Sequence, residues 1–465
     1  MSVEAQKNAA PQEITLQNLV ILAEMGREKE VREKITTLHP ADIAELINAL
    51  EEPKVRSKVF SFLAPEAAPR VLSLVSPLAR QEIARDLPES HLQQILEELE
   101  SDDAADLLDS LPKERAQTLL ERLSEPLAAR IQQLLRYPAD TAGGLMQTEY
   151  AAVLEGATVE ETIEIVRSLA EAVPDIHNVF VVDRHFHLTG VLPLSRLILA
   201  RAGERVEAVM DWQVISVTVD TDQKEVAQLF KKYDLVSLPV TDSQGTLLGR
   251  ITVDDVVDVL EKEATEAIYT IAGVQHTAVE KINLISDPVL KRVRLRFSWI
   301  LITLTFELFV ALVISKLFVN TVEKLAILTA FIPVIIAIAG NVGLQSSTLV
   351  VRSIALGTIS LSKTVRIVFS ETRTGFLLGL ICGMITCTLG FVMNMANPEV
   401  AQLVVSVFIG MTSALTAAAT IGTIEPLILH QLKQDPAVSS GPLITAVNDL
   451  MGTTMYLLVA TLLER

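Results

Sequence analysis

Cysteine is almost absent from this chain of 465 residues, because Cys382 and Cys387 are the only two. They stand five apart in an apolar run, on different faces of a helix, so the sequence predicts no disulfide framework and no cysteine metal site. The first eleven residues lack the apolar core of a cleaved signal, and we expect the acidic region after them to stay in the cytoplasm. The sequence also lacks a nucleophile–base pair, a Walker loop and a zinc-protease motif, which argues against an enzyme.

Charge is divided unequally along the chain. The net charge is −18, from 57 acidic and 39 basic residues, but only 8 of the acidic and 12 of the basic residues lie from Lys291 onward. Half of the residues are apolar and the mean hydropathy is +0.39, which indicates a membrane region in the second part. The acidic first part disfavours nucleic acid or anionic lipid as a partner and is compatible with cations. The alternative is an acidic surface that only confers solubility.

Residues 1–137 predict an all-α cytosolic domain. Short amphipathic segments, with leucine, isoleucine and valine at three- and four-residue spacing, alternate with prolines. The prolines follow His39, Ala64, Ser76, Leu87, Leu111 and Glu125. Because proline is tolerated in the first turn of a helix, we expect a superhelical stack of helix hairpins.

The next segment contains an internal repeat. Leu145-Met146 matches Val209-Met210, and residues 179–183 match residues 238–242. Each copy predicts strand, helix, strand, turn, strand and helix, so we expect two α/β units at 138–203 and 204–263 that bury each other's sheets. The pattern resembles a tandem pair of CBS (cystathionine-β-synthase) domains.

The remaining chain predicts a connector helix at 264–290 and an α-helical membrane domain at 291–465. Basic residues from Lys291 to Arg296 precede Phe297 and Trp299, as at the cytoplasmic start of a transmembrane helix. Five apolar spans of about the length that a bilayer requires are predicted at 297–318, 325–350, 375–396, 400–429 and 443–463. Loops that hold Arg352 to Arg373 and Lys433 are basic and should lie inside. We therefore expect a multi-pass protein of the inner (plasma) membrane with cytoplasmic amino-terminal domains.

Asp449 is an ionisable residue inside the last span. A charge at the centre of a membrane helix costs roughly 2.5–3.5 kcal/mol, so it persists where it meets water, an ion or a partner. Thr445, Asn448 and Gly452 share its helix face. Carboxylate, amide and hydroxyl oxygens suit a hard cation, so the stripe predicts a cation site, and across a dimer it would line a pore. The alternative is an interhelical hydrogen bond.

The second span contains the run Gly340–Ser347, in which Asn341 and Gln345 share a helix face. Its glycines permit close approach of another backbone. One interpretation is that Asn341 and Gln345 line the pore, and the alternative is that the run serves helix packing through small residues. Glu307 in the first span and Glu425 in the fourth are weaker candidates for an ion or proton relay.

Carboxylates gather in two cytosolic segments at helical spacing, where each like-charge pair costs roughly 0.2–0.5 kcal/mol unless a counter-ion intervenes. The first segment holds Asp102, Asp103, Asp106 and Asp109, and the second holds Asp254, Asp255, Asp258, Glu261, Glu263 and Glu266. A divalent cation would relieve the repulsion. The alternative for each cluster is a solvated acidic face.

A nucleotide-contact pattern of CBS units is present at Gly249–Asp255, where Thr252 and Asp254 would hold a ribose or phosphate. The equivalent stretch of the first unit, Gly190–Arg196, is degenerate. The sequence therefore suggests ATP as a ligand of the CBS pair, held by the second unit.

Taken in order, these parts resemble the MgtE family of magnesium channels and transporters along almost the whole chain. The motifs that carry the resemblance are Tyr137-Pro138 with Ala142–Met146, Thr252–Val256, Gly340-Asn341 with Gln345, and Asp435-Pro436-Ala437 leading to Gly441-Pro442, Thr445 and Asp449.

The resemblance implies a homodimer with a pore between its protomers, Asp449 at the hydrated Mg²⁺ site and Asn341 nearby. It also implies regulatory Mg²⁺ sites at Asp103, Asp106, Asp222, Asp234, Asp255, Asp258, Glu263, Glu266 and Asp435. This chain departs from the family at Arg70 and Lys224, where glutamate is common, at Ala267, where an acid is common, and at Leu344, where asparagine is common.

The function implied is a Mg²⁺-selective channel that cytosolic Mg²⁺ inhibits. Two alternatives remain open. One is a less selective transporter of Co²⁺ or Mn²⁺, because an oxygen-rich site admits several divalent ions. The other is a membrane-anchored CBS nucleotide sensor, although an anchor has no need of the polar stripes in two spans.

Overall fold

The computed structural model describes residues 16–170, 173, 175–201, 203–271, 288–324, 326–355, 364–393, 400–434, 436 and 441–464. The chain divides into two compact units, residues 1–263 and 264–465. Each is described by itself.

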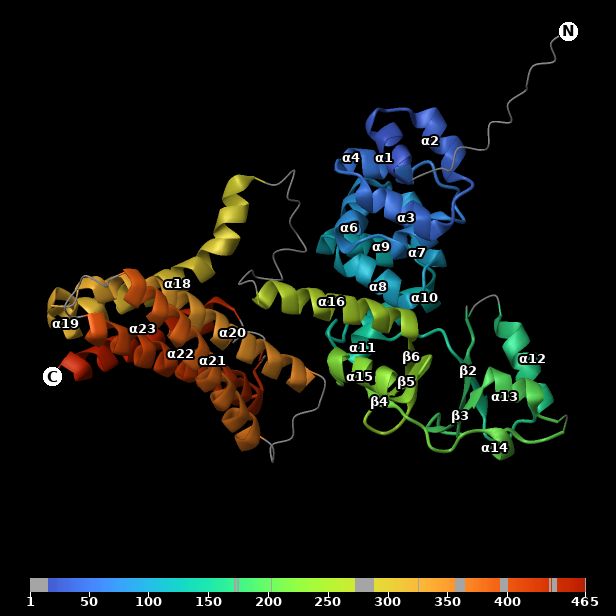
Figure 1. The fold of residues 1–465 in the computed structure, drawn as a ribbon. Helices are drawn as coiled ribbons and strands as arrows, with labels where there is room; N and C mark the ends of the chain where they lie inside the picture. The colour runs from blue at the N-terminus through green and yellow to red at the C-terminus, as the bar shows by residue number, and fades with distance from the viewer. Residues whose placement is uncertain are drawn as a thin grey trace, which may run out of the picture. The chain divides into compact units, whose positions relative to one another are not determined.

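The first unit begins with a stack of short helices (Figure 1), as the proline pattern predicts. They are α1 (Leu16–Glu24), α2 (Glu28–Ile35), α3 (Pro40–Ala49), α4 (Pro53–Phe60), α5 (Ala68–Leu74), α6 (Pro77–Asp86), α7 (Glu89–Glu98), α8 (Ser101–Asp109), α9 (Lys113–Leu120) and α10 (Glu125–Leu134). Of the predicted prolines, Pro40, Pro77 and Pro126 occupy first-turn positions. Pro88 and Pro112 stand one residue earlier, as the N-cap residues of α7 and α9. From α3 onward each helix packs on the helix two places along the chain, which produces the predicted superhelical arrangement.

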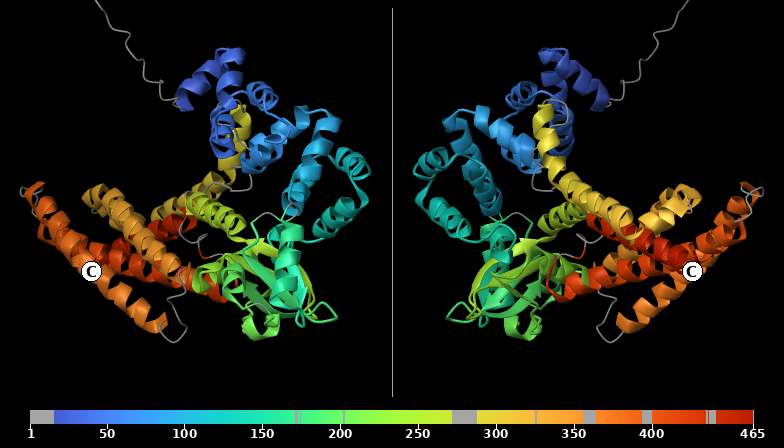
Figure 2. Two further views of the ribbon diagram at one scale, coloured as in Figure 1. Left: turned by 90° about the vertical axis from the view of Figure 1, so that its right-hand side faces the viewer. Right: turned by 90° about the vertical axis from the view of Figure 1, so that its left-hand side faces the viewer.

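Two three-stranded sheets follow, one in each repeat. Their strands belong to the green part of the ribbon in Figure 2. The first repeat, after the short helix α11 (Ala142–Leu145), contains β1 (Ala151–Leu154), α12 (Val159–Leu169), β2 (Asn178–Val182), β3 (Leu188–Pro193) and α13 (Leu194–Leu199). The second, after α14 (Val206–Val209), contains β4 (Val217–Thr218), α15 (Gln223–Tyr233), β5 (Ser237–Thr241), β6 (Leu247–Thr252) and α16 (Val253–Ile271). In both sheets the first pair of strands is parallel and the second is antiparallel. The predicted tandem α/β fold is confirmed.

The second repeat and the helical stack share one apolar core, whereas the first repeat has a core of its own. Leu238 and Val256 of the second repeat belong to the same buried cluster as the leucines of α8. This packing is consequential because it places α8 and α16, the two helices that carry the acidic segments, in one compact body.

The second unit is a bundle of long helices. It contains α18 (Val289–Leu317), α19 (Val319–Lys324), the 3₁₀ helix η1 (Ala326–Phe331), α20 (Ile332–Ala355), α21 (Thr364–Met393), α22 (Val400–Gln431) and α23 (Pro442–Glu464). Among the described residues, five apolar helical stretches are long enough to cross a membrane, at 300–317, 329–354, 364–392, 404–431 and 444–463. Helix α22 packs against α20, α21 and α23, and α18 packs against α23.

The structure corrects one prediction about the basic residues between the second and third spans. Arg352 lies in α20, and Arg366 and Arg373 lie in α21, so none of the three is in a loop. The third span was predicted from residue 375, after the last of these charges, whereas the apolar helix α21 begins at Thr364 and includes Arg366 and Arg373. The connector predicted at 264–290 is described only at its ends, because α16 runs without a break to Ile271 and α18 begins at Val289.

Candidate cation sites

In the first unit, α8 and α16 each carry aspartates whose negative charges repel one another. Asp102 and Asp103 lie in the first turn of α8, and Asp254 and Asp255 lie in the first turn of α16. Asp102 interacts electrostatically with Asp255, and Asp103 interacts with Asp254 and Asp258. The two acidic segments predicted separately therefore form one site, which we call the α8–α16 acidic cluster.

The environment of this cluster disfavours its negative charge. Burial raises the pKa of Asp102 well above its usual range, and the charges of Asp255 and Asp103 add to the effect. Burial also raises the pKa of Asp255 to about 7, although the Thr252 hydroxyl donates to Asp255 Oδ2 at 2.6 Å and opposes the shift. Asp102 Oδ1 is buried without a hydrogen-bond partner among the described residues. A hard cation with retained waters fits such an oxygen-only set.

Basic side chains already balance part of the charge. Arg80 Nη1 of α6 lies 3.4 Å from Asp103 Oδ1. At the other end of the cluster Lys224 Nζ lies 2.8 Å from Glu263 Oε2, and Gln223 Nε2 donates to Glu263 Oε1 at 2.9 Å. Lys224, which departs from the resembled family, thus contacts one of the predicted regulatory carboxylates.

The other predicted regulatory residues are dispersed. Asp106 is the exception, because it lies one turn beyond Asp103 on α8, and burial together with the charges of Asp103 and Asp109 raises its pKa to about 6. Glu266 lies on α16 in the second unit. Asp222 caps the start of α15, and Asp234 adopts a left-handed conformation at its end. An eleven-residue helix is about 16 Å long, so these two carboxylates do not share an ion within one protomer. Asp435 lies outside the described residues.

The raised pKa values predict a pH dependence for the first unit. Asp255 and Glu100, both with a pKa of about 7, hold protons in the folded state at a pH where the unfolded chain has lost them. The free energy of unfolding should therefore fall as pH rises from about 4 to about 7. We expect the full-length protein in EDTA to unfold at a higher temperature near pH 6 than near pH 8. Calorimetry checks this, and a reversed order would contradict the expectation.

The membrane unit holds the second site, on α23. Asp449 is 7% exposed, and its Oδ1 has no hydrogen-bond partner among the described residues. Asn448 is fully buried, and neither atom of its amide has a partner there. Glu307 of α18 is an electrostatic neighbour of Asp449. Two carboxyls and an uncommitted amide at membrane depth require a proton, water or a cation.

Glycines of α20 allow this polar stripe to approach. A Cβ added at Gly340 would lie 3.5 Å from Asp449 Oδ1, and one at Gly343 would overlap the amide of Asn448. The glycine-rich run and the stripe of α23, identified independently in the sequence, therefore meet in one bundle. Asn341 and Gln345 are exposed on α20, and Thr445 is partly exposed.

Two features of the sites were underestimated from the sequence. Glu307 ranked as a weak candidate, yet it neighbours Asp449, and its charge within an apolar span was the available signal. The sequence treats Asp102 only as one member of a cluster, yet Asp255 is the neighbouring charge that affects it most.

Among the residues that the structure describes, no three histidine, cysteine, aspartate or glutamate side chains form a ready metal-ligand set. In the nucleotide pattern, Thr252 donates to Asp255 and Asp254 is exposed.

The fold defines a multi-pass membrane protein in which an acidic helical domain and two small α/β units precede long apolar helices. Family comparisons agree. Residues 332–459 match the family described as divalent cation transporter, 38–140 match the MgtE intracellular N domain, and 206–262 match the CBS domain. The chain belongs to the MgtE family of magnesium transporters, and Mg²⁺ is its transported substrate.

Individual relatives support the assignment over most of the chain. The magnesium transporter MgtE of Thermus thermophilus is 37% identical over 338 residues, which cover 72% of each chain. That of Enterococcus faecalis is 34% identical over 348 residues, 73% of this chain and 72% of the relative. The crystal structure of the cytosolic domain of the Mg²⁺ channel MgtE in complex with ATP is 40% identical, covers 53% of this chain and 100% of that one, and has a TM-score of 0.49.

Proposed function

We propose that this transporter is a homodimeric Mg²⁺-selective channel that cytosolic Mg²⁺ closes. The observation that carries the pore assignment is the buried Asp449 carboxylate with an unpartnered oxygen, next to the uncommitted amide of Asn448. Mg²⁺ gives up its waters reluctantly, so one carboxylate per protomer would hold it in hydrated form.

The exposed face of α20 supports a dimer. Asn341 and Gln345 are exposed on this membrane helix, and side-chain amides are unfavourable in lipid. A second copy placed against this face would bury them or enclose water beside them.

Feedback follows from the α8–α16 acidic cluster. Without a cation, its carboxylates repel and α8 is held less firmly against α16. Bound Mg²⁺ would supply the positive charge that draws the helices together, and Asp102, Asp103, Asp255 and Asp258 would hold it. Asp106, Asp222, Asp234, Glu263, Glu266 and Asp435 remain proposed regulatory ligands. Tighter packing of the cytosolic region would then favour the closed pore.

Patch recording of the channel tests conduction and feedback together. We expect a Mg²⁺ current that falls as Mg²⁺ is raised on the cytosolic face. A current that ignores cytosolic Mg²⁺ would refute the feedback, and flux of Co²⁺ or Mn²⁺ equal to that of Mg²⁺ would favour the less selective transporter.

ATP remains a proposed ligand of the second CBS unit, at Thr252 and Asp254. Because the Thr252 hydroxyl is engaged with Asp255, nucleotide binding there should compete with the cluster for that hydroxyl. Calorimetric titration of ATP with and without Mg²⁺ tests this proposal. Tight binding together with absent ion flux in proteoliposomes would instead favour the membrane-anchored sensor.

A further inference from the structure

Arg250 is a buried cation in the second CBS unit. It lies on β6, and its residue is 2% exposed. A guanidinium stays protonated in proteins, and burial of its charge is costly unless hydrogen bonds and opposite charges compensate. The groups around the Arg250 side chain therefore indicate which charges it balances.

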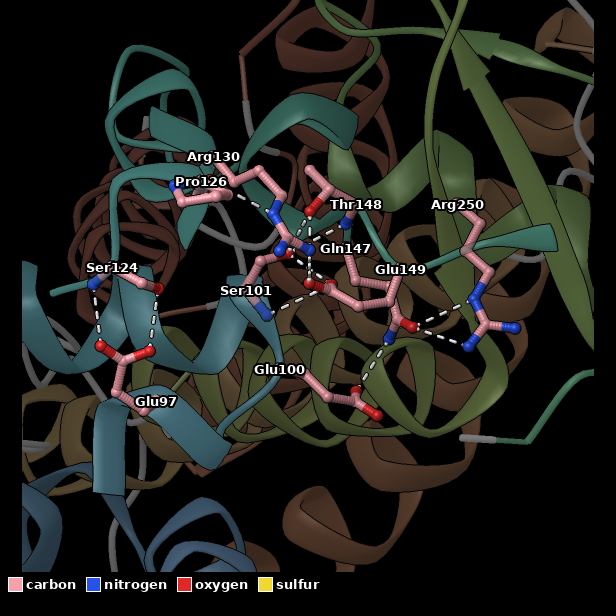
Figure 3. A network of polar contacts seen from close by, with 10 residues as sticks. All are labelled: Glu97, Glu100, Ser101, Ser124, Pro126, Arg130, Gln147, Thr148, Glu149 and Arg250. Atoms are coloured by element: carbon pink, nitrogen blue, oxygen red, sulfur yellow. Dashed lines mark hydrogen bonds and ion pairs between the residues drawn. The ribbon is translucent and has the colours of Figure 1, made fainter. Parts of the chain in front are cut away.

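Gln147, which follows α11, meets the guanidinium directly (Figure 3). Gln147 Oε1 accepts hydrogen bonds from Arg250 Nε at 3.0 Å and from Nη2 at 2.8 Å. The backbones of the two residues also pair, with N–O distances of 2.8 and 3.0 Å. Arg250 Nη1 donates to the carbonyl oxygen of Asp175 at 3.3 Å. These contacts fix the position of the positive charge.

The side-chain amide of Gln147 links the Arg250 guanidinium to α8. Its Nε2 donates to Glu100 Oε2 at 3.0 Å, so its oxygen faces the cation and its nitrogen faces the carboxylate. Glu100 is the N-cap residue of α8, the helix that carries Asp102 and Asp103. The charge of Arg250 counteracts the burial and the acidic neighbours that raise the pKa of Glu100.

A second set of contacts secures the same end of α8 (Figure 3). Ser101 Oγ donates to Glu149 Oε2 at 2.6 Å, and the amide of Thr148 donates to Ser101 Oγ at 2.9 Å. Arg130 Nη1 of α10 lies 3.0 Å from Glu149 Oε1. The segment 147–149 thus binds the start of α8 on one side and β6 on the other.

We propose that Arg250 is a tethered cation that holds the start of α8 on the second CBS sheet through Gln147 and Glu100. It is a positioning residue, because it holds α8 through Gln147 and through the attraction of its charge for Glu100. Its charge also attracts Asp254 and Asp255 of α16. This inference rests on the proposed feedback. Its consequence is that Arg250 lowers the cytosolic Mg²⁺ concentration at which the α8–α16 acidic cluster binds the ion and the pore closes. The helical stack remains anchored at Glu100 and Ser101 when Mg²⁺ is scarce, while the cluster beyond this anchor responds to the ion.

Hydrogen exchange of the full-length protein in nanodiscs tests the proposal. In EDTA, Arg250→Met should speed the exchange of α8 amides at least about tenfold, because removal of one partner of a buried charged contact is costly. The Mg²⁺ concentration that restores half of the protection should rise at least about fivefold, since the added ion must replace a lost positive charge. Arg167→Met, which breaks an exposed ion pair with Glu164, is the matched control and should change neither value.

A double-mutant cycle separates the charge effect from a general loss of packing. In a Glu100→Gln background, Arg250→Met should change α8 exchange less than about threefold, because contacting charged residues are coupled and not additive. If Arg250→Met does not fold, Arg250→Lys retains the charge without the planar fork and should give about a threefold increase.

Two outcomes overturn the proposal: unchanged α8 exchange in EDTA, or additive effects in the cycle. A wild-type protein whose current ignores cytosolic Mg²⁺ would refute the proposed feedback instead. The comparison in EDTA would still decide whether Arg250 anchors α8.

Discussion

Replacement of Asp449 with asparagine should reduce Mg²⁺ uptake at least about tenfold, because a carboxylate attracts a unit charge about 4 Å away by roughly 4 kcal/mol at an effective dielectric constant of 20. The side chain is buried beside Glu307 in the bundle, and asparagine keeps its size while removing its charge. Uptake of Mg²⁺ into a host that lacks its own uptake systems measures the effect. Normal uptake would remove Asp449 from the conduction path.

Glu371 offers a matched control within the same bundle. Its Oε2 accepts a hydrogen bond from Ser346 Oγ at 3.0 Å, so its carboxylate already has a structural partner. Glu371→Gln can keep this contact through its amide oxygen and should leave uptake near the wild-type level. Equal loss in both variants would mean that any charge change in the bundle impairs transport, and Asp449 would have no special role.

Local sequence patterns predicted the helices and strands of this fold, because each pattern depends only on the residues of its own segment. First-turn prolines such as Pro40 and Pro77 mark helix starts wherever the helix later packs. The repeat centred on residues 179–183 and 238–242 predicted two equivalent sheets, and both formed. The apolar spans gave the number of membrane helices, but not the helical ends, where Arg366 and Arg373 continue α21.

Contacts between distant segments could not be predicted in the same way. The carboxylates around Asp102 and those around Asp255 recur at helical spacing within their own segments. No local sequence pattern indicates that α8 packs beside α16. Arg250 was missed as a functional residue because a single basic residue in a strand has no periodic signal. Its meaning comes only from Gln147 and Glu100, which the fold brings to it. Charge within an apolar span was a better guide, since it identified Asp449 and, less firmly, Glu307.

Replacement of both Asp255 and Asp258 with asparagine is the more demanding test of feedback, because two effects of this change oppose each other. Neutral side chains remove the repulsion toward Asp102 and Asp103, as a bound cation does. They also remove the ligands that would hold the cation. If relief of repulsion alone closed the pore, the variant would stay closed without Mg²⁺.

We expect loss of inhibition instead, because neutral side chains only remove the repulsion between α8 and α16, whereas a bridging divalent ion adds attraction to both helices. The variant should therefore conduct at cytosolic Mg²⁺ concentrations at least about tenfold above those that close the wild type, since even about 1.4 kcal/mol of lost ion affinity corresponds to that factor. Patch recording measures the shift, and Asp211→Asn, at an exposed ion pair with Arg196, is the control. Unchanged inhibition would exclude these two carboxylates as sensors, and a permanently closed channel would show that neutralisation alone is sufficient.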